Sequence, residues 1–259
     1  MFAAARLPLN FNADGIEEDY ARIGAGEWTA HFNRDYFQGD WSGVSLHGGS
    51  GGPAGGNSLL VGHGVADYDA SGVKDRCPHL HAVIESFHCP LRAVRLLKLS
   101  AGSIIREHRD YDLGYEQGEV RIHVPVITHP QVEFYLDNKR IIMNPGECWY
   151  LDLNRPHRVY NRGQTDRIHL VIDCVLNDWL RDIISKGEAC EGKESSFEDF
   201  RRLVLVDPEL QQQLATAQDR VELIAKSEEL GRARGFDFLA ADVEAAMRIA
   251  RESLKRSVA

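Results

Sequence analysis

The sequence lacks the features that mark membrane, secreted and nucleic-acid-binding proteins. No apolar run approaches the roughly 18 residues that a membrane-spanning helix requires. The N-terminus has no basic stretch followed by an apolar segment, so we expect no signal peptide. Acidic residues outnumber basic ones by 39 to 30, and the net charge of -9 argues against a nucleic-acid or membrane-surface partner.

Cysteine is also scarce and irregularly spaced. The five cysteines are an odd number without framework spacing: Cys77, Cys89, Cys148, Cys174 and Cys190. Reduced thiols in a cytoplasmic protein are therefore expected. A zinc site built from Cys77, His79, His81 and the later His88-Cys89 pair would match no standard tetrahedral spacing, so ordinary packing is favoured there.

From Leu91 onward the chain contains a series of short segments with strand character. They are rich in Val, Ile and Tyr and are separated by turn residues. The predicted strands are Arg92–Leu99, Ser103–His108, Val120–Ile127, Val132–Leu136, Lys139–Met143, Glu147–Leu151, Arg158–Asn161 and Arg167–Val175. Evenly spaced strands without intervening helices predict a mainly β fold, a double-stranded β-helix (jelly-roll, cupin-like) core at about 91–178 with flanking helices.

The N-terminal part is mixed. Helices are predicted around Ile16–Ile23 and over Leu80–Phe87. The glycine-rich segment Trp41–Gly56 is predicted to be a strand that runs into a loop. A surface loop is the favoured interpretation there, and a loop that gates an active site is the alternative.

After Cys190 the composition changes to that of a small helical domain. A polar linker is followed by helices predicted to begin at Ser196, Pro208, Asp219 and about Ala240, with Asp219 and Glu222 in a capping-box pattern. The sequence therefore predicts two domains, 1–190 and a C-terminal all-α appendage at 195–259.

Two histidines and one aspartate form the most informative pattern. His108 and Asp110 are separated by one residue, and side chains two apart on a strand point to the same side. His157 would come from a distant strand and complete three ligands. Such a set leaves three octahedral positions open, as non-haem Fe(II) requires to hold a co-substrate and dioxygen at once.

Nearby arginines predict a ligand with a carboxylate at each end. Arg121 and His123 share one side of a predicted strand, and Arg167 follows His157 across a turn. A guanidinium group matches a carboxylate as a planar bidentate donor. 2-Oxoglutarate is such a ligand, because one end chelates iron and the other needs a cation deeper in the barrel.

At these residues the chain resembles the aspartyl/asparaginyl β-hydroxylase family of Fe(II)/2-oxoglutarate dioxygenases, which includes bacterial proline hydroxylases. The resemblance runs from about Arg92 to Asp178. The motifs that carry it are Ile105–Tyr111, Arg121–Val124, Pro145–Asp152, Pro156-His157 and Arg167–Asp173.

The resemblance implies that His108, Asp110 and His157 bind iron. It also implies that Arg167 pairs with the distal carboxylate of 2-oxoglutarate, and that Arg121 and His123 bind its other end. The activity implied is hydroxylation of an sp3 carbon, in a small amino acid or in an Asp/Asn residue of a peptide or protein. Fe(II), 2-oxoglutarate and dioxygen are the implied cofactors, with succinate and carbon dioxide as co-products.

Two positions depart from the peptide-hydroxylating members. The mammalian-type enzymes have glycine where this chain has Asp110, so the chain resembles the complete-triad bacterial branch. Those enzymes also carry a substrate-binding arginine at the position of Glu119. If Glu119 faces the pocket, it would repel an anionic substrate side chain.

Other interpretations remain open. The core could be a non-catalytic sensor that binds a metal or dicarboxylate and signals through the tail, or a zinc- or manganese-bearing cupin isomerase. Arg121 could form a structural salt bridge with Glu119 or Glu133, while His129 and His169 are expected to be packed or surface residues without a role in the site. A second resemblance is carried by residues of the tail: Phe197, Phe200, Asp207–Leu210, Leu214, the predicted helix Ala217–Leu230 and Gly235–Phe238. At these residues the tail resembles a nitrogen-fixation-associated helical domain that also occurs as peptide leader segments. It is a candidate docking module for a peptide or protein, and a stabilising extension is the alternative.

Overall fold

The computed structural model describes residues 2–31, 33–47, 73–194 and 196–257. These residues form two compact units, Met1–Leu136 with Ile141–Glu191, and Asp137–Arg140 with Gly192–Ala259. No helix within the described ranges is long and apolar enough to cross a membrane. The predicted strand at Trp41 is present, but the predicted glycine loop at 48–56 lies outside the described residues.

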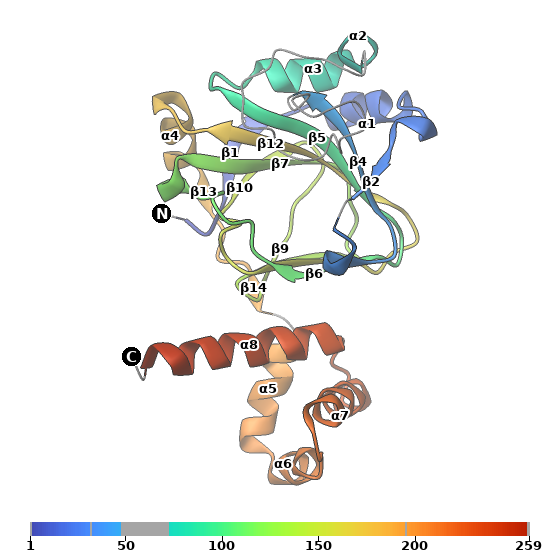
Figure 1. Ribbon diagram of the computed structural model, residues 1–259, viewed down its shortest axis with the longest axis vertical. Helices are drawn as coiled ribbons and strands as arrows, with labels where there is room; N and C mark the ends of the chain where they lie inside the picture. Colours follow the sequence, from blue (N-terminus) through green and yellow to red (C-terminus); the bar gives the residue numbers. More distant parts are fainter. Residues whose placement is uncertain (1, 32, 48–72, 195, 258–259) are drawn as a thin grey trace. The chain divides into compact units, whose positions relative to one another are not determined.

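The first unit is built from two facing antiparallel sheets (Figure 1). The larger sheet has the order β13 (Glu188–Ala189), β1 (Ala4–Asn10), β10 (Glu147–Leu151), β7 (Glu119–Ile127), β12 (Arg167–Val175), β5 (Leu91–Leu99), β4 (Trp41–His47) and β2 (Thr29–Ala30). The smaller sheet contains β8 (Val132–Leu136), β11 (His157–Asn161), β6 (Ile104–His108) and β3 (Phe37–Gln38), and it continues into β9 (Lys139–Ile141), of which Lys139 and Arg140 are assigned to the second unit.

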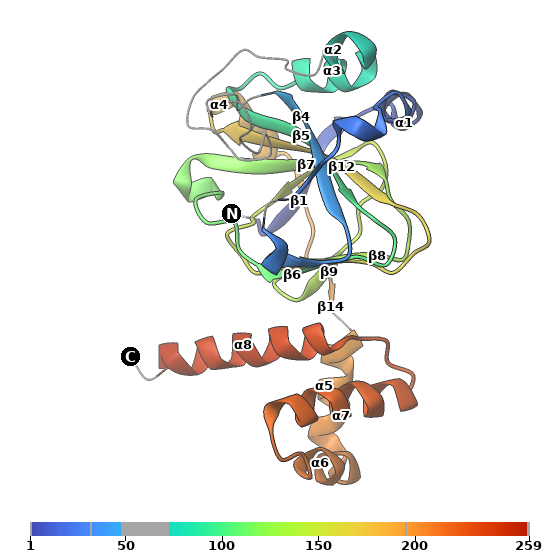
Figure 2. The ribbon, with the colours of Figure 1, turned by 45° about the vertical axis from the view of Figure 1, so that its right-hand side comes forward.

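The order of the strands confirms the predicted mainly β fold. From β5 to β12 the chain passes back and forth between the two sheets, and only β8 and β9 follow one another in the same sheet. This alternation winds the chain into a double-stranded β-helix. Figure 2 shows β4, β5, β7 and β12 on one side of the unit and β6, β8 and β9 on the other.

Side-chain alternation along β12 and β7 places polar groups between the two sheets. The even-numbered residues are apolar and pack into the core on the outer face of the larger sheet: Ile168, Leu170, Ile172, Cys174, Val120, Ile122, Val124 and Val126. The odd-numbered residues point the opposite way, because successive strand side chains alternate. They include Arg167, His169, Asp173, Arg121 and His123, all of which are charged or polar.

Helices cover the outer face of the larger sheet (Figure 1). They are α1 (Ala13–Ala21), α2 (Val73–Arg76), α3 (Pro78–Glu85) and α4 (Asp178–Ser185), with short 3-10 turns at Ala25–Glu27, Arg34–Tyr36 and Tyr115–Gln117. Helix α3 begins two residues earlier than predicted. Pro78 occupies its first turn, where a missing N–H has no consequence.

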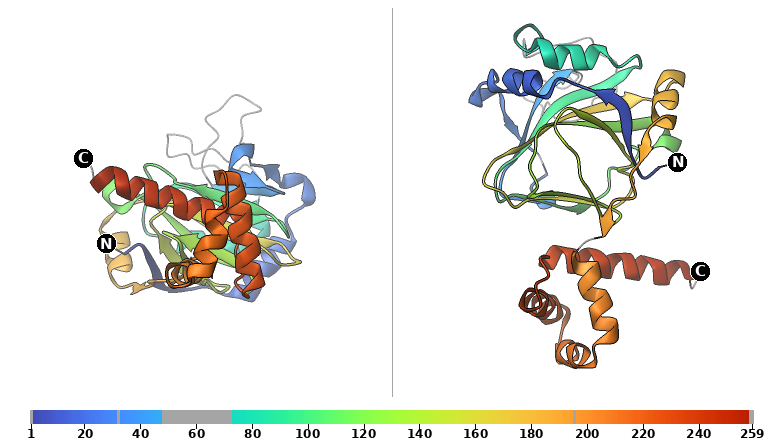
Figure 3. Two further views of the ribbon diagram at one scale, coloured as in Figure 1. Left: turned by 90° about the horizontal axis from the view of Figure 1, so that it is seen from below. Right: turned by 180° about the vertical axis from the view of Figure 1, so that it is seen from behind.

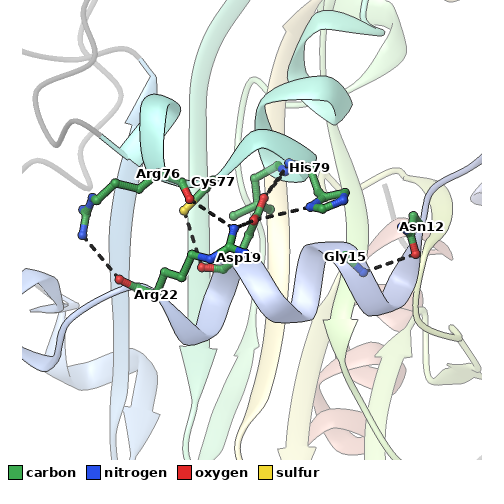
Figure 4. Close-up of polar contacts among 8 residues, drawn as sticks. Asn12, Gly15, Asp19, Arg22, Arg76, Cys77 and His79 are labelled. Atoms are coloured by element: carbon green, nitrogen blue, oxygen red, sulfur yellow. Dashed lines mark hydrogen bonds and ion pairs between the residues drawn. The ribbon is translucent and has the colours of Figure 1, made fainter.

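The carboxylate of Asp19 joins α1 to α3 (Figure 4). It is fully buried and accepts hydrogen bonds from the backbone N–H groups of His79, at 2.6 Å, and Leu80, at 2.9 Å. Arg22 donates to the same carboxylate at 2.5 Å. Cys77 is buried and its thiol donates to the Asp19 carbonyl, so this region is packed as predicted.

We expect Asp19→Ala to destabilise the first unit by roughly 2–3 kcal/mol, because two N–H groups at the start of α3 lose their acceptor. Arg22→Ala is the matched control. It removes an ion pair whose arginine is half-exposed and leaves both N–H bonds to the buried carboxylate, so it should cost less than about 1 kcal/mol. Urea unfolding followed by tryptophan fluorescence measures both, since all four tryptophans belong to this unit. Equal losses in the two variants would contradict the capping role.

The second unit is helical (Figure 3). It contains β14 (Lys193–Glu194), α5 (Ser196–Val206), α6 (Pro208–Ala215), α7 (Arg220–Ala233) and α8 (Ala240–Ser257). Its own core consists of Phe197, Phe200, Leu210, Ile224, Phe238 and Val243. Asp207 and Asp219 cap α6 and α7 through the N–H groups of Leu210 and Glu222, at 3.0 and 2.8 Å.

Candidate metal and co-substrate site

The three predicted metal ligands lie together. His108 ends β6 and is paired directly with His157 at the start of β11. Asp110 follows His108 by two residues, and ligand atoms of the three side chains lie within 4.8 Å of one another. In the described part of the chain this is the one group with such geometry, so the region around Cys77 and His79 shows none.

The donor set fits a divalent iron. His108 Nδ1 lies 2.8 Å from the Arg106 carbonyl and His157 Nδ1 lies 3.0 Å from the Arg155 carbonyl. A carbonyl can only accept, so each Nδ1 carries the proton and each Nε2 keeps a lone pair for a metal. Two imidazoles and one carboxylate, grouped so that they could occupy one face of a metal's coordination sphere, match the facial set that Fe(II) oxygenases use.

The protonation states suit metal binding at neutral pH. Burial lowers the pKa of His157 to about 3, and it also lowers the pKa of His108. Burial is the largest single influence and would raise the pKa of Asp110, but the surrounding positive groups, Arg121 first among them, together leave that pKa below its usual value. The site therefore presents two neutral histidines and one carboxylate.

Metal affinity should accordingly change little with pH near neutrality. Protons compete for a ligand histidine only as the pH falls toward its folded-state pKa. Two histidines with ordinary values would lose roughly tenfold in affinity between about pH 8 and about pH 6. For this site we expect less than about a twofold loss over that range. Titration with Mn(II) at both pH values measures it, and a tenfold loss would refute the lowered pKa values.

A chain of charged groups leads away from Asp110. Arg121 donates to Asp110 and also holds Asp173, with Nε at 2.5 Å and Nη2 at 3.0 Å from the two carboxylate oxygens. Arg95 donates to Asp173 as well. Asp173 is 1% exposed, so it is a buried carboxylate shared by two arginines. Arg121 is thereby fixed beside the proposed metal ligand.

The alternative salt bridges considered for Arg121 are wrong. Glu119 pairs with Arg92 at 2.9 Å, and Glu133 pairs with Arg162 at 3.1 Å. The cross-strand register places Arg121 opposite Asp173 instead. Glu119 is not among the described residues that line the cavity. The condition under which it would repel an anionic substrate is therefore not met.

Arg167 is a buried cation without a carboxylate partner in the described part of the chain. It is 2% exposed, and its Nη2 donates to His169 Nδ1 at 2.7 Å. Its Nε has no hydrogen-bond partner there. Burial lowers the pKa of Arg167 to about 9, which still leaves the group positively charged at neutral pH.

The metal group and the arginines Arg95, Arg121 and Arg167 line one cavity of about 310 Å³. The six predicted residues line it: His108, Asp110, His157, Arg121, His123 and Arg167. It is also lined by residues to which sequence reasoning gave no site role: His31, Tyr36, Trp41, Arg95, Leu97, Ile105, Arg109, Tyr111, Leu113, Phe134, Leu153 and Val159. A charged residue flanked on both sides by apolar ones within a strand was the available signal for Arg95, between Val94 and Leu96, and for Asp173, between Ile172 and Cys174.

The two histidines predicted to be packed or surface residues do not line the cavity. His129 lies against Gly163, where an added Cβ would come within 2.0 Å of its ring. His169 is 1% exposed and contacts Arg167 and His123.

The family model for aspartyl/asparaginyl β-hydroxylases matches residues 11–176. That range contains every described residue that lines the cavity. The chain belongs to the aspartyl/asparaginyl β-hydroxylase family, and the assignment made from the sequence is confirmed.

A curated relative is the L-proline cis-4-hydroxylase of Rhizobium meliloti (strain 1021), which is 26% identical over 167 residues. The match covers 64% of this chain and 58% of the relative, so it spans less than two thirds of the relative's length. Among solved structures, a prolyl-4-hydroxylase from Pseudomonas putida has 12% identity and a TM-score of 0.42, covering 68% of this chain and 94% of that one. A 2OG-Fe(II) oxygenase family oxidoreductase from Burkholderia pseudomallei has 11% identity and a TM-score of 0.43, covering 67% and 85%.

Proposed function

We propose that the protein is an Fe(II)/2-oxoglutarate-dependent dioxygenase that hydroxylates an sp3 carbon of an amino acid. One observation carries the proposal. A single cavity holds a His-Asp-His metal group and, buried in its wall, an arginine without a carboxylate partner among the described residues. A metal site alone would not require such a cation, whereas a dicarboxylate co-substrate does.

In this proposal His108, Asp110 and His157 hold Fe(II). Arg167 binds the distal carboxylate of 2-oxoglutarate, and Arg121 and His123 lie at its other end. When bound, the metal with 2-oxoglutarate and dioxygen supplies the oxidising chemistry that inserts oxygen into a C–H bond and releases succinate and carbon dioxide.

The chain itself supplies orientation and a dry environment. Arg121 holds Asp110 in place through a hydrogen bond, and the two backbone carbonyls hold the imidazole rings in their metal-binding tautomers. Apolar side chains from both sheets line the cavity and exclude water: Leu97, Ile105, Phe134, Leu153 and Val159. Exclusion of water strengthens each charge interaction with the co-substrate.

For the substrate we favour a small free amino acid over an Asp/Asn residue in a peptide. The relative that hydroxylates L-proline supports this choice, as does a cavity at the lower end of the range for small-ligand sites. A screen that offers free amino acids and peptides side by side decides it, by mass measurement of a product heavier by one oxygen atom. A product formed from peptides alone would reverse the choice.

The alternative is a non-catalytic sensor of a metal or dicarboxylate. Succinate formation from 2-oxoglutarate in the presence of Fe(II) and dioxygen, even without a substrate, separates the two. No succinate from protein that binds both ligands would favour the sensor.

We propose further that the helical unit binds a peptide or protein partner. The exposed apolar side chains Leu205 and Val206 on α5 and Val221 on α7 support this. A peptide or protein that binds the unaltered chain should bind the triple serine variant at least about tenfold more weakly, since burial of each apolar side chain contributes roughly 1.5 kcal/mol or more. Unchanged binding with intact helical circular dichroism would refute the role of these residues.

A further inference from the structure

His169 lies behind the cavity wall and contacts two of its residues. It sits two residues from Arg167 on the same face of β12 and accepts from Arg167 Nη2 at 2.7 Å. His123 Nδ1 lies 3.3 Å from the same His169 nitrogen, with the two rings at 74°. His169 itself is not among the described residues that line the cavity.

The hydrogen-bond pattern assigns the protons in this group. A guanidinium group has only donors, so His169 Nδ1 is the acceptor and its proton sits on Nε2. The proton between the two rings must then sit on His123 Nδ1. Burial, followed by the charge of Arg167, lowers the pKa of both histidines well below the usual value, so both rings are neutral.

This arrangement holds Arg167 without cancelling its charge. A carboxylate at the position of His169 would also fix the guanidinium group, but it would form an ion pair and compete with an incoming anion. A neutral acceptor directs Nη2 and leaves the full positive charge for a ligand. The unpaired Nε of Arg167 shows that the guanidinium group keeps donor capacity.

We propose that His169 is a positioning residue that aims Arg167 at the distal carboxylate of the co-substrate while keeping its charge available. The inference rests on the proposed function of Arg167. It also refines the role of His123, whose neutral ring leaves charge recognition at the iron end to Arg121.

The test uses the full chain loaded with Mn(II) in the absence of dioxygen, and measures 2-oxoglutarate affinity by calorimetry. His169→Leu removes the acceptor and should weaken binding about tenfold, the lower end for a hydrogen bond to a charged group. His169→Asn keeps an acceptor near the same place and should stay within about threefold of the unaltered protein. His169→Asp, of the same size as Asn, adds a negative charge and should weaken binding by more than about 100-fold.

A second readout separates positioning from packing. Pyruvate has the 2-oxo acid end but lacks the distal carboxylate, so its affinity should not depend on His169. The preference for 2-oxoglutarate over pyruvate should therefore fall about tenfold in His169→Leu, while Mn(II) affinity is unchanged. A packing defect would weaken both 2-oxo acids together.

The outcomes decide between the two proposals. Unaltered 2-oxoglutarate affinity in His169→Leu or in His169→Asp overturns the positioning role. If His169→Leu fails to fold, the Asn and Asp variants decide, because they match in shape and differ in charge. The Arg167→Met variant shows whether the role of Arg167 or only the role of His169 is wrong. If this variant binds 2-oxoglutarate with normal affinity, the assigned role of Arg167 is wrong. If its affinity falls but that of the His169 variants does not, only the positioning role of His169 is overturned.

Discussion

Replacing His157 with alanine is expected to abolish succinate formation. The ring supplies one of only three protein ligands, and loss of even an outer partner of a metal ligand typically costs 10- to 100-fold in metal affinity. Loss of the ligand itself should therefore weaken metal binding by at least about 100-fold. Mn(II) titration and succinate release under saturating 2-oxoglutarate measure the two effects separately.

His129→Ala is the matched control for this variant. His129 also lies in the first unit, packed against Gly163, but it does not line the cavity. Its replacement should leave metal affinity and succinate release close to those of the unaltered protein. Full turnover of His157→Ala with reconstituted iron would remove this histidine from the site.

Replacing Arg167 with methionine is expected to raise the 2-oxoglutarate requirement by at least about 30-fold, because truncating one partner of a buried charge pair costs 2 kcal/mol or more. Metal affinity should not change, since Arg167 does not contact the three ligands. The melting temperature measured with and without 2-oxoglutarate gives an independent readout, because the co-substrate stabilises only protein that binds it.

The same variant should not destabilise the protein in the absence of 2-oxoglutarate. Arg167 is buried without a carboxylate among the described residues, so its removal relieves a desolvated charge rather than breaking an ion pair. A marked loss of stability without ligand, combined with an unchanged 2-oxoglutarate requirement, would make Arg167 a structural residue.

Much of the site could be predicted because strand periodicity is local. His108 and Asp110, and likewise Arg121 and His123, are two residues apart, so their shared face follows from the pleat. Predicted strands such as Val132–Leu136 and Arg167–Val175 match the observed ones for the same reason. The helix over Leu80–Phe87 was misplaced because its start depends on Asp19, a residue about 60 positions away.

The partners of the charged residues could not be predicted in this way. Arg121 bonds with Asp173 because β7 and β12 pair in a register that places the two residues opposite each other. No local pattern contains that register. His31, Tyr36 and Trp41 reach the cavity from the N-terminal segment, through strands and a turn at the sheet edges.

The sequence by itself determined which side chains could bind a metal and a dicarboxylate, because ligand type and two-residue spacing are written along the chain. The tertiary structure decided what surrounds them. It set His157 beside His108 across two strands, shared Asp173 between Arg121 and Arg95, and left Arg167 facing a neutral histidine. The reason is physical: hydrogen-bond partners and desolvation depend on strand register and sheet packing, which bring together residues that are distant in the sequence.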